Sequence, residues 1–236
     1  APQSAFVHGV GLLPPDIAEM ATHGTALIWS PRSNITLYGD TAWAPVAARM
    51  GVQIALGTDW SATGSINLLR ELSCADEFNQ SYWGGYFNDQ QLWEMVTSSA
   101  ASVTATDDVI GSIVVGRVAD LSILDGTTRT AYRAVLDAEP KDVVLVMRGG
   151  KPLYGEANTI AALATGCDAV DVCGNAKQLC LMSEIGKTYS ALRTSVGTTY
   201  PAFFCGVPTN EPTCVPKRPA GVAGRLAEST TAEVAT

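Results

Sequence analysis

Charge is scarce in this sequence. Only 16% of its 236 residues are charged, whereas 47% are hydrophobic, and this balance excludes an intrinsically disordered chain. Fifteen Lys and Arg residues stand against 23 Asp and Glu residues, so the clustered positive charge of a nucleic-acid groove is missing. No apolar run reaches the roughly 18–20 residues that span a bilayer. We therefore expect a folded chain with no nucleic-acid partner and no membrane-spanning segment.

Histidine is rarer still, with two residues in the whole chain. His8 follows a short apolar run and precedes the glycine-rich segment 9–11, so its loop can approach a ligand closely. His23 stands at the predicted end of a helix, where a histidine meets the helix dipole, and we interpret it as structural. Of the two, His8 is the candidate for function.

Cysteine lacks the paired Cys-x-x-Cys spacing of a zinc ribbon, which favours disulfides over a metal. Cys74 stands alone, and five more crowd the end of the chain: Cys167, Cys173, Cys180, Cys205 and Cys214. We predict a Cys205–Cys214 pair and a pair between two of the three preceding cysteines, which leaves one that is free or joins Cys74. Disulfides imply an oxidising compartment, so we expect a secreted or periplasmic protein.

The distributions of charged residues and of cysteines along the chain both change near Gly155. Residues 1–156 hold 9 basic and 17 acidic residues, whereas residues 157–236 hold 6 of each. We predict that residues 157–236 form a disulfide-rich extension with a helix over 183–196. Its end, over residues 220–236, is rich in small and polar residues and is predicted to be mobile.

Three short apolar runs, each followed by a helical pattern, indicate an α/β fold. The runs cover residues 5–7, 25–29 and 52–56, and the helices begin near Asp16 or cover residues 44–50 and 67–79. Nearly all-apolar strands that alternate with helices are typical of a buried parallel sheet. Polar residues stand just after each strand, as at the C-terminal face of a (β/α)8 barrel. Three repeats cannot close a barrel of eight, so we predict that residues 1–108 are the last three βα units of a TIM-like barrel.

The segment that follows is richer in strands. Residues 86–105 still predict a helix, but residues 109–156 predict a small β-sandwich segment. Its expected strands cover residues 110–113, 118–124, 143–147 and 152–154, with a hairpin turn at 148–151.

The residues after the second and third runs are able to carry chemistry. Asp59 follows an apolar strand, where a carboxylate is costly to bury unless it meets a metal, a cation or hydrogen-bond donors. The alternative is that Asp59 caps the following loop. Ser30, Ser33 and Asn34 either bind substrate through their hydroxyl and amide groups or close an Asx-type turn, and the sequence leaves both open.

Several ordered motifs together resemble the amidohydrolase superfamily, in the branch of cytosine deaminase and triazine hydrolase. After the strand that ends at His8, the resemblance rests on SPRSNITLYG at 30–39, GVQIALGTDW at 51–60, LLREL at 68–72 and IGSIVVGRVADL at 110–121. It covers about residues 5–156. It implies a metal-dependent hydrolase whose barrel is followed by a small β-sandwich.

The resemblance also implies roles for single residues. Asp59 matches the aspartate that ligates the metal and takes the proton of the attacking water. His8 matches a histidine that is a metal ligand in two-metal members; in the single-metal members, which this sequence resembles, it hydrogen-bonds the water or the substrate carbonyl. Ser30 and Asn34 match the loop near the substrate, and Trp60 is expected in the pocket wall. The implied cofactor is one divalent metal, with zinc as the expected ion.

The departures from the family pattern are as informative. The family pattern has a His-x-His after its first strand and another histidine after its fifth, and neither is present here. A zinc site with two protein ligands or fewer is incomplete. We therefore expect the remaining ligands in a complementary N-terminal half or a second chain, or a homo-oligomer that covers the open barrel edge.

Two readings of function follow. In the first, this chain is the C-terminal portion of a metal-dependent amidohydrolase that acts on non-peptide C–N bonds of a small molecule, as a deaminase or a cyclic amide or amidine hydrolase. It is then inactive without the N-terminal half. In the second, it is a catalytically incomplete relic or binding module that keeps the fold. Dechlorination and ester cleavage stay open, because a metal-bound water does not choose the leaving group.

Overall fold

A computed structural model describes residues 4–197 and 201–217 of the chain, and these residues form two compact units. The first comprises residues 4–111 together with 210–217, and the second comprises residues 112–197 and 201–209. The chain therefore leaves the first unit, builds the second and then returns to the first. The predicted mobile end over residues 220–236 lies outside the described residues.

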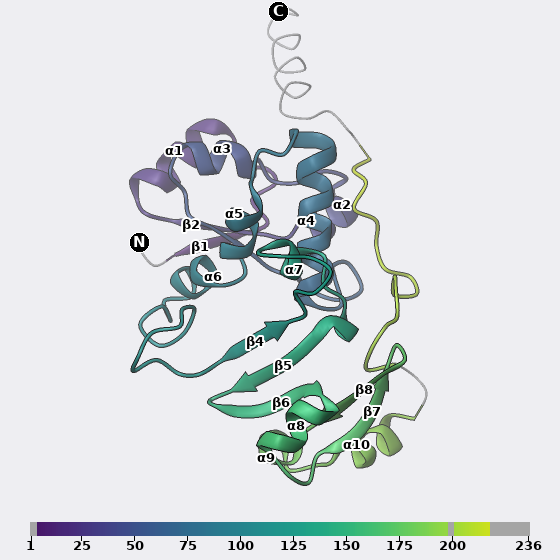
Figure 1. Ribbon diagram of the computed structural model, residues 1–236. Helices are drawn as coiled ribbons and strands as arrows, with labels where there is room; N and C mark the ends of the chain where they lie inside the picture. The colour runs from purple at the N-terminus through teal and green to yellow at the C-terminus, as the bar shows by residue number, and fades with distance from the viewer. Residues whose placement is uncertain (1–3, 198–200, 218–236) are drawn as a thin grey trace, which may run out of the picture. The chain divides into compact units, whose positions relative to one another are not determined.

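A three-stranded parallel sheet forms the centre of the first unit. Strands β1 (Ala5–Val7), β2 (Ala26–Trp29) and β3 (Ile54–Leu56) lie in chain order (Figure 1). Parallel pairing sets Val7 beside Ile28 and Ala55 beside Ile28 from the other side. The three predicted strands and their parallel direction are confirmed. β1 is an edge strand, and Phe6 and Val7 on it are each 52% exposed.

Helices follow each strand of this sheet. They are α1 (Pro14–Thr22), α2 (Pro31–Tyr38), α3 (Ala44–Arg49), α4 (Leu68–Trp83), α5 (Asp89–Glu94) and α6 (Ser98–Val103). α3 and α6 both pack against β2 and β3, and α2 packs against α4. α1 begins two residues before the expected Asp16, because proline suits the first turn of a helix. The Asp16 carboxylate accepts the N–H of Leu13 at 2.8 Å instead of standing at the helix start.

Two sequence predictions in this unit are wrong. Residues 31–38 form helix α2 where a loop was expected, because Pro31 starts the helix and Gly39, at φ 81°, ends it. The single helix expected over residues 86–105 is two short helices. Between them Thr97 leaves helical geometry, and the carbonyl of Met95 accepts the N–H of Leu56 from β3 at 2.9 Å.

The core of the first unit is aromatic and lies between β2 and α4. Trp29 is fully buried and its ring lies 5.1 Å from that of Trp83, with Phe87 at 6.3 Å. Phe78 meets Trp83 edge-on at 4.9 Å. Aromatic side chains bury large apolar areas, so this cluster fixes the end of β2 and hence the residues that follow it.

Residues 210–217, which we call the C-terminal strap, bind to the first unit between α2 and α4. Cys214 forms a disulfide with Cys74 of α4. Glu211 forms ion pairs with Arg32 and Arg70, and the N–H of Lys217 donates to the carbonyl of Gly39 at 2.8 Å. The strap thus joins the two helices that follow β2 and β3.

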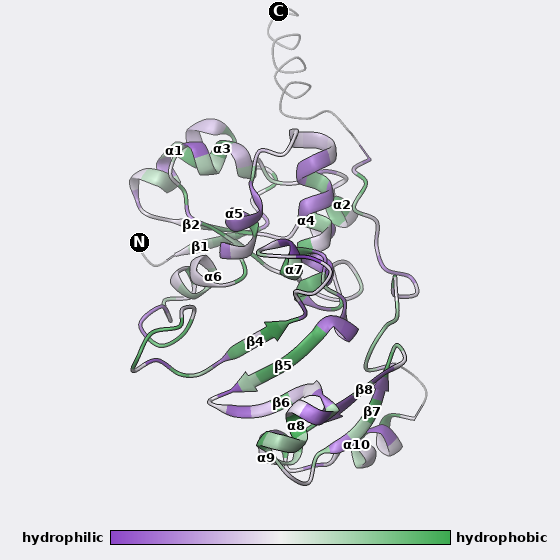
Figure 2. Ribbon diagram, in the orientation of Figure 1, coloured by the Kyte–Doolittle hydropathy of each residue, from purple (hydrophilic) through white to green (hydrophobic). Residues whose placement is uncertain are grey.

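The second unit contains one five-stranded antiparallel sheet. Its strands are β4 (Leu121–Leu124), β5 (Val143–Arg148), β6 (Lys151–Glu156), β7 (Asp168–Val172) and β8 (Asn175–Leu179), in the order β4-β5-β6-β8-β7. Figure 2 shows that β4 and β5 are the most hydrophobic of the five. The β5–β6 hairpin is as predicted, whereas the described residues contain no second sheet facing this one to complete a sandwich.

The expected strand at residues 110–113 is absent. Gly111 has a φ of 86°, in the left-handed region, and a Cβ there would lie 2.3 Å from the Cβ of Ala101. The chain therefore turns sharply against α6 instead of extending. Ile113, which the expected strand would have packed, is 89% exposed, and Val115 just after it is 103% exposed.

Two strands of the predicted disulfide-rich extension, β7 and β8, belong to the second sheet. β8 pairs with β6, and short helices flank the strands: α7 (Arg133–Leu136), α8 (Ala157–Leu163), α9 (Met182–Ile185) and α10 (Tyr189–Val196), with a 3-10 turn at Pro140–Asp142. The helix expected over 183–196 is broken at Gly186, which has a φ of 66°. In the described part of the chain no helix is long and apolar enough to cross a membrane.

The disulfides correct the predicted pairing. The bonds are Cys74–Cys214, Cys167–Cys180 and Cys173–Cys205, so the predicted Cys205–Cys214 pair is wrong. The reason is that Cys205 and Cys214, although close in sequence, belong to different units. The predicted pair between two of the three earlier cysteines is confirmed as Cys167–Cys180. Cys74 bonds a cysteine of the tail, as one of the two alternatives had it, but that cysteine is Cys214.

Candidate active site

The candidate residues gather at one edge of the three-stranded sheet. His8 directly follows β1, Ser30 and Asn34 follow β2, and Asp59 follows β3. The carboxyl ends of parallel strands meet at the same edge, so residues far apart in sequence become neighbours there. Backbone hydrogen bonds hold the strand ends together, from His8 N–H to the carbonyl of Ile28 at 3.1 Å and from Gly57 N–H to that of Trp29 at 2.9 Å.

His8 and Asp59 face each other across this edge. The Nε2 atom of His8 lies 3.6 Å from Oδ2 of Asp59, and the side chains are 25% and 29% exposed. Both groups are therefore held by the protein and yet open to a solute. This distance is longer than a normal hydrogen bond, which leaves room for a third group to contact either side chain.

Both residues have an unusual backbone conformation. The φ angle is 70° at His8 and 57° at Asp59, in the left-handed region that residues other than glycine rarely adopt. Such conformations cost roughly 1–3 kcal/mol and persist where the surrounding structure enforces them, often at functional sites. The two turns aim both side chains at the same space beyond the sheet edge.

Ser33 holds the carboxylate of Asp59. Its hydroxyl donates to Oδ2 at 2.5 Å, and this bond is the main reason that the pKa of Asp59 lies below its usual range. Burial opposes the shift, while the backbone N–H of Trp60 and the nearby His8 add to it. A lowered pKa means that Asp59 is ionised at neutral pH and can accept a proton or a cation.

Asn34 lies behind His8 rather than in the open site. Its side chain is fully buried, and its Nδ2 atom lies 2.9 Å from Nδ1 of His8. Its Oδ1 atom accepts the hydroxyl of Thr41 at 3.1 Å, and Thr41 in turn accepts the indole N–H of Trp29 at 2.7 Å. Asn34, which was predicted to contact the substrate, therefore contacts His8 in the structure.

Ser30 and Trp60 occupy opposite extremes of exposure. Ser30 is 1% exposed at the start of α2, and a Cβ on Gly57 would lie 3.4 Å from its hydroxyl. Trp60 is 69% exposed in the loop after Asp59. Tyr38, also exposed, presents its ring edge to His8 with 6.0 Å between the ring centres. The substrate-contact roles expected for Ser30, Asn34 and Trp60 stay predictions.

Sequence reasoning missed part of this arrangement. Ser33 was one of several polar residues in a supposed loop, and only the helical turn of α2 brings it to Asp59. Trp29 and Thr41 flank the motif at 30–39, but nothing in the sequence linked either of them to His8. The one clue in the sequence to the position of Ser33 was that it stands three residues after Ser30, on a helix that begins at Pro31.

A complete metal site does not lie within the described residues. Among them no three His, Cys, Asp or Glu side chains gather closely enough to hold an ion. His8 and Asp59 could supply two ligands at most, which is fewer than a zinc site requires. The residues described here therefore fit part of a metal site and not a whole one.

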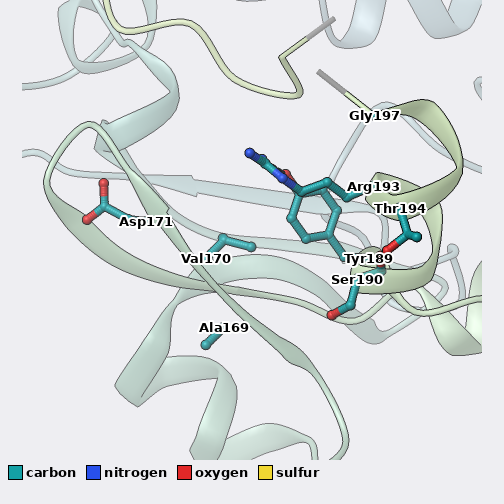
Figure 3. Close-up of a pocket in the computed structure, with 8 residues that line it drawn as sticks. All are labelled: Ala169, Val170, Asp171, Tyr189, Ser190, Arg193, Thr194 and Gly197. Carbon is teal, nitrogen blue, oxygen red and sulfur yellow. Dashed lines mark hydrogen bonds between the residues drawn. The ribbon is translucent and has the colours of Figure 1, made fainter. Parts of the chain in front are cut away.

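A cavity lies in the second unit, between β7 and α10. This cavity of about 730 Å³ is lined by Val170 and Asp171 from the strand and by Tyr189 and Arg193 from the helix (Figure 3). Arg193 reaches the hydroxyl of Tyr189 at 3.3 Å, and their side chains lie beside each other in Figure 3. None of the candidate residues lines this cavity.

A family model for the amidohydrolase family matches residues 2–153. The match includes the whole of the sheet edge described above and covers more than half of the sequence. The chain belongs to the amidohydrolase family. The match ends within β6, so the disulfide-bonded strands β7 and β8 lie beyond it.

Among curated relatives, a 5-methylthioadenosine/S-adenosylhomocysteine deaminase from Teredinibacter turnerae is 30% identical over 127 residues, which are 52% of this chain and 29% of the relative. An aminodeoxyfutalosine deaminase from Deinococcus radiodurans is 41% identical over 76 residues, which are 32% of this chain and 18% of the relative. The chain thus spans less than a third of the length of these amidohydrolases.

Solved structures agree on the fold. An adenosine deaminase from Xanthomonas campestris with bound zinc has a TM-score of 0.58 at 25% identity, over 63% of this chain and 36% of that one. An atrazine chlorohydrolase from Arthrobacter aurescens complexed with zinc has a TM-score of 0.58 at 20% identity, over 69% of this chain and 40% of that one. The chain therefore shares an α/β fold with these two enzymes.

Proposed function

We propose that this chain carries the proton-handling part of a metal-dependent amidohydrolase that hydrolyses non-peptide C–N bonds of small molecules. Deamination is the favoured reaction, and hydrolysis of a cyclic amide or amidine is the variant of it that the same residues would serve. The observation that carries the proposal is the open pair of His8 Nε2 and Asp59 Oδ2, 3.6 Å apart at the ends of β1 and β3. The names of the relatives, deaminases in both cases, support it.

Each side chain has a task in this proposal. Asp59, ionised and held by Ser33, takes a proton from the attacking water and passes it to the leaving nitrogen. His8 binds the substrate atom that gains negative charge. Trp60 and Tyr38, exposed beside the pair, would line the pocket and stack on a planar ring.

The proposed cofactor is one divalent metal, with zinc as the expected ion, bound through Asp59 and, in the two-metal alternative, His8. Such an ion supplies a water that is activated near neutral pH. The structural neighbours with bound zinc support this assignment. Because the described residues lack a third ligand, we propose that the others come from polypeptide outside this sequence and that the chain alone is inactive.

The open edge of the sheet supports a partner of that kind. β1 has no neighbouring strand on its outer side among the described residues, and Phe6 and Val7 are half exposed there. An unpaired parallel strand with apolar side chains is a poor surface to leave in water. We propose that a complementary N-terminal half, or a second copy of the chain, pairs with β1.

The three disulfides support an oxidising location. Every cysteine in the chain is bonded, two of the pairs in the second unit and one in the first. Disulfides persist outside the reducing cytosol, so we propose a secreted or periplasmic protein.

The decisive experiment compares Asp59→Asn with Asp108→Asn in the protein isolated together with its natural partner polypeptide. Ammonia release from aminopurines, aminopyrimidines and aminotriazines is measured alongside zinc content. We expect Asp59→Asn to lower turnover by about 10³-fold or more, because it removes the proton acceptor. Asp108, an exposed residue of the same unit, should be replaceable without loss.

Other outcomes would overturn the proposal. Ammonia release that survives Asp59→Asn would remove Asp59 from its task. Release of chloride or a carboxylic acid without ammonia would assign a different leaving group. Binding of ring compounds with neither zinc nor turnover would establish a non-catalytic binding module.

A further inference from the structure

A buried line of hydrogen bonds runs from the core of the first unit to His8. Trp29 Nε1 lies 2.7 Å from Thr41 Oγ1, Thr41 Oγ1 lies 3.1 Å from Asn34 Oδ1, and Asn34 Nδ2 lies 2.9 Å from His8 Nδ1. Trp29, Thr41 and Asn34 are all 1% exposed or less. In such a place each polar atom needs a partner, so the direction of one bond constrains the next.

The direction can be read from the indole end. An indole N–H can only donate, so the oxygen of Thr41 accepts it. The hydroxyl hydrogen of Thr41 then points to Asn34 Oδ1, which accepts it and fixes the amide with Nδ2 toward His8. An amide NH2 can only donate, so Nδ1 of His8 must be the bare nitrogen of the ring. The proton of the neutral imidazole therefore sits on Nε2.

We propose that Trp29, Thr41 and Asn34 are positioning residues that hold neutral His8 as its Nε2–H tautomer. His8 then acts in the proposed active site as a hydrogen-bond donor and not as a metal ligand, because a protonated nitrogen offers no lone pair to an ion. The inference deepens the proposed function and rests on it, because that function is what makes the surroundings of His8 an active site. It identifies the residues of this chain that would hold His8 in the hydrogen-bonding role.

The donor is also available to a substrate. Nε2 points toward Asp59 Oδ2 at 3.6 Å, which is too long for a full hydrogen bond. The N–H can therefore reach an incoming acceptor, such as a carbonyl oxygen or an unprotonated ring nitrogen next to the carbon under attack. A substrate that presents an N–H at this point would meet a second donor and be rejected.

Histidine NMR tests the tautomer directly, because the chain has only two histidines. The full chain is labelled with ¹⁵N-histidine, and long-range proton–nitrogen spectra are recorded near pH 8.5, where a histidine of ordinary pKa is neutral. A His23→Gln variant assigns the second set of signals. We expect the Nε2–H pattern at His8, favoured roughly tenfold over Nδ1–H, the ratio that one additional buried hydrogen bond gives.

Two substitutions each alter one hydrogen-bonding side chain between Trp29 and His8. Asn34→Asp replaces the amide donor with an acceptor of the same shape, and we expect His8 to switch to Nδ1–H. Thr41→Val removes the hydroxyl that orients Asn34, and we expect the preference to fall toward an even mixture. Thr41→Ser keeps the hydroxyl and should retain the original tautomer. Thr36→Val, on the same helix as Asn34 but bonded only to the carbonyl of Arg32, is the matched control.

An even mixture or Nδ1–H in the unaltered protein would overturn the inference, as would an unchanged tautomer in both folded Asn34→Asp and folded Thr41→Val proteins. If Asn34→Asp does not fold, the unaltered protein and the Thr41 pair still decide the result. The spectra need neither a metal nor turnover. An Nε2–H signal in the chain, together with no ammonia release from its zinc-loaded complex with the partner polypeptide, would defeat the proposed function alone. Ammonia release from that complex without an Nε2–H signal in the chain would defeat this inference alone.

Discussion

Glu71 is a buried carboxyl group of the first unit that the proposed chemistry does not use. It is fully buried on α4, where its Oε1 atom accepts the backbone N–H of Arg32 at 3.2 Å. Burial raises its pKa from 4.5 to about 7, although hydrogen bonds from Ser65 and Arg32 and the charge of Arg32 oppose the shift. Glu211 of the strap adds to the rise by like-charge repulsion.

Glu71 makes the stability of the first unit depend on pH. Its pKa is higher in the folded than in the unfolded state, so folding is favoured while the group is protonated and is weakened as pH rises from 4.5 to about 7. The corresponding loss in the free energy of unfolding is about 3 kcal/mol. Urea denaturation at pH 5 and pH 8 measures it. We expect Glu71→Gln to abolish this loss, whereas Glu77→Gln, exposed on the same helix, should keep it.

Stability that is flat across this range in the unaltered protein would show that Glu71 stays ionised when buried.

At the scale of single residues, the sequence predicts which residues belong to the site. It predicts the contacts of those residues less well. His8 and Asp59 stand out because polar residues directly after apolar strands have few structural reasons to be there. The partners Ser33 and Asn34 depend on which way α2 turns its side chains, and that is decided by packing against α4. A motif can therefore nominate a histidine without revealing how its ring is held.

The loop from β3 to α4 shows how one element fixes the position of a functional side chain. The N–H of Ser65 donates to the carbonyl of Thr58 at 3.2 Å, and that of Gly64 to the carbonyl of Trp60 at 2.6 Å. A Cβ at Gly64 would lie 1.9 Å from the Thr58 oxygen. Only glycine fits so close an approach, and Asp59 lies inside the loop that it closes.

Replacement of Gly64 by alanine should open this loop. We expect Gly64→Ala to lower the free energy of unfolding by about 1–3 kcal/mol, the usual cost of forcing a carbon atom into a packed site. The displaced loop should also lose the bond from Ser33 to Asp59, which the carboxyl ¹³C shift of Asp59 reports. Gly11→Ala is the control, since a Cβ there meets nothing within 4 Å. Equal stability of the two variants would show that the loop yields freely.

Elements with a strong local pattern are the ones that sequence predicts. The strands of the first sheet and helices α3 and α4 follow their apolar spacing closely. The helix expected over 86–105 fails because β3 takes the Met95 carbonyl, and the strand expected at 110–113 fails because Gly111 turns against α6. In both cases a contact with a distant residue overrules the local preference.

The segment from Cys74 to Cys214 is closed into a loop by the first disulfide. Cys74 and Cys214 are 140 residues apart, and the second unit lies between them. The order of strands in the second sheet and this pairing could not be predicted, because both depend on the return of the strap to the first unit. Sequence spacing alone favoured a short loop from Cys205 to Cys214.

Removal of this bond should destabilise the first unit strongly. A loop of 140 residues corresponds to about 5 kcal/mol of lost chain entropy in the unfolded state, and one of 13 residues to about 3 kcal/mol. We expect Cys74→Ala with Cys214→Ala to lower the free energy of unfolding by up to the larger amount. Tryptophan fluorescence is the measurement, because all five tryptophans lie between residues 29 and 93.

The double substitution of Cys167 and Cys180, which belongs to the second unit, should leave that fluorescence transition unchanged. A first unit that is equally stable without Cys74 and Cys214 would mean that the ion pairs of Glu211 retain the strap by themselves.

The loop closed by the Cys74–Cys214 disulfide also determines what proteolysis can release from this protein. A single cut anywhere from residue 75 to residue 213 severs the backbone but frees no fragment, because the sulfur bridge still ties the two pieces together. Nicked molecules would run as one species on a gel until a thiol reagent parts them. Damage to the second unit would thus stay hidden, and its remains would stay tethered to the first unit.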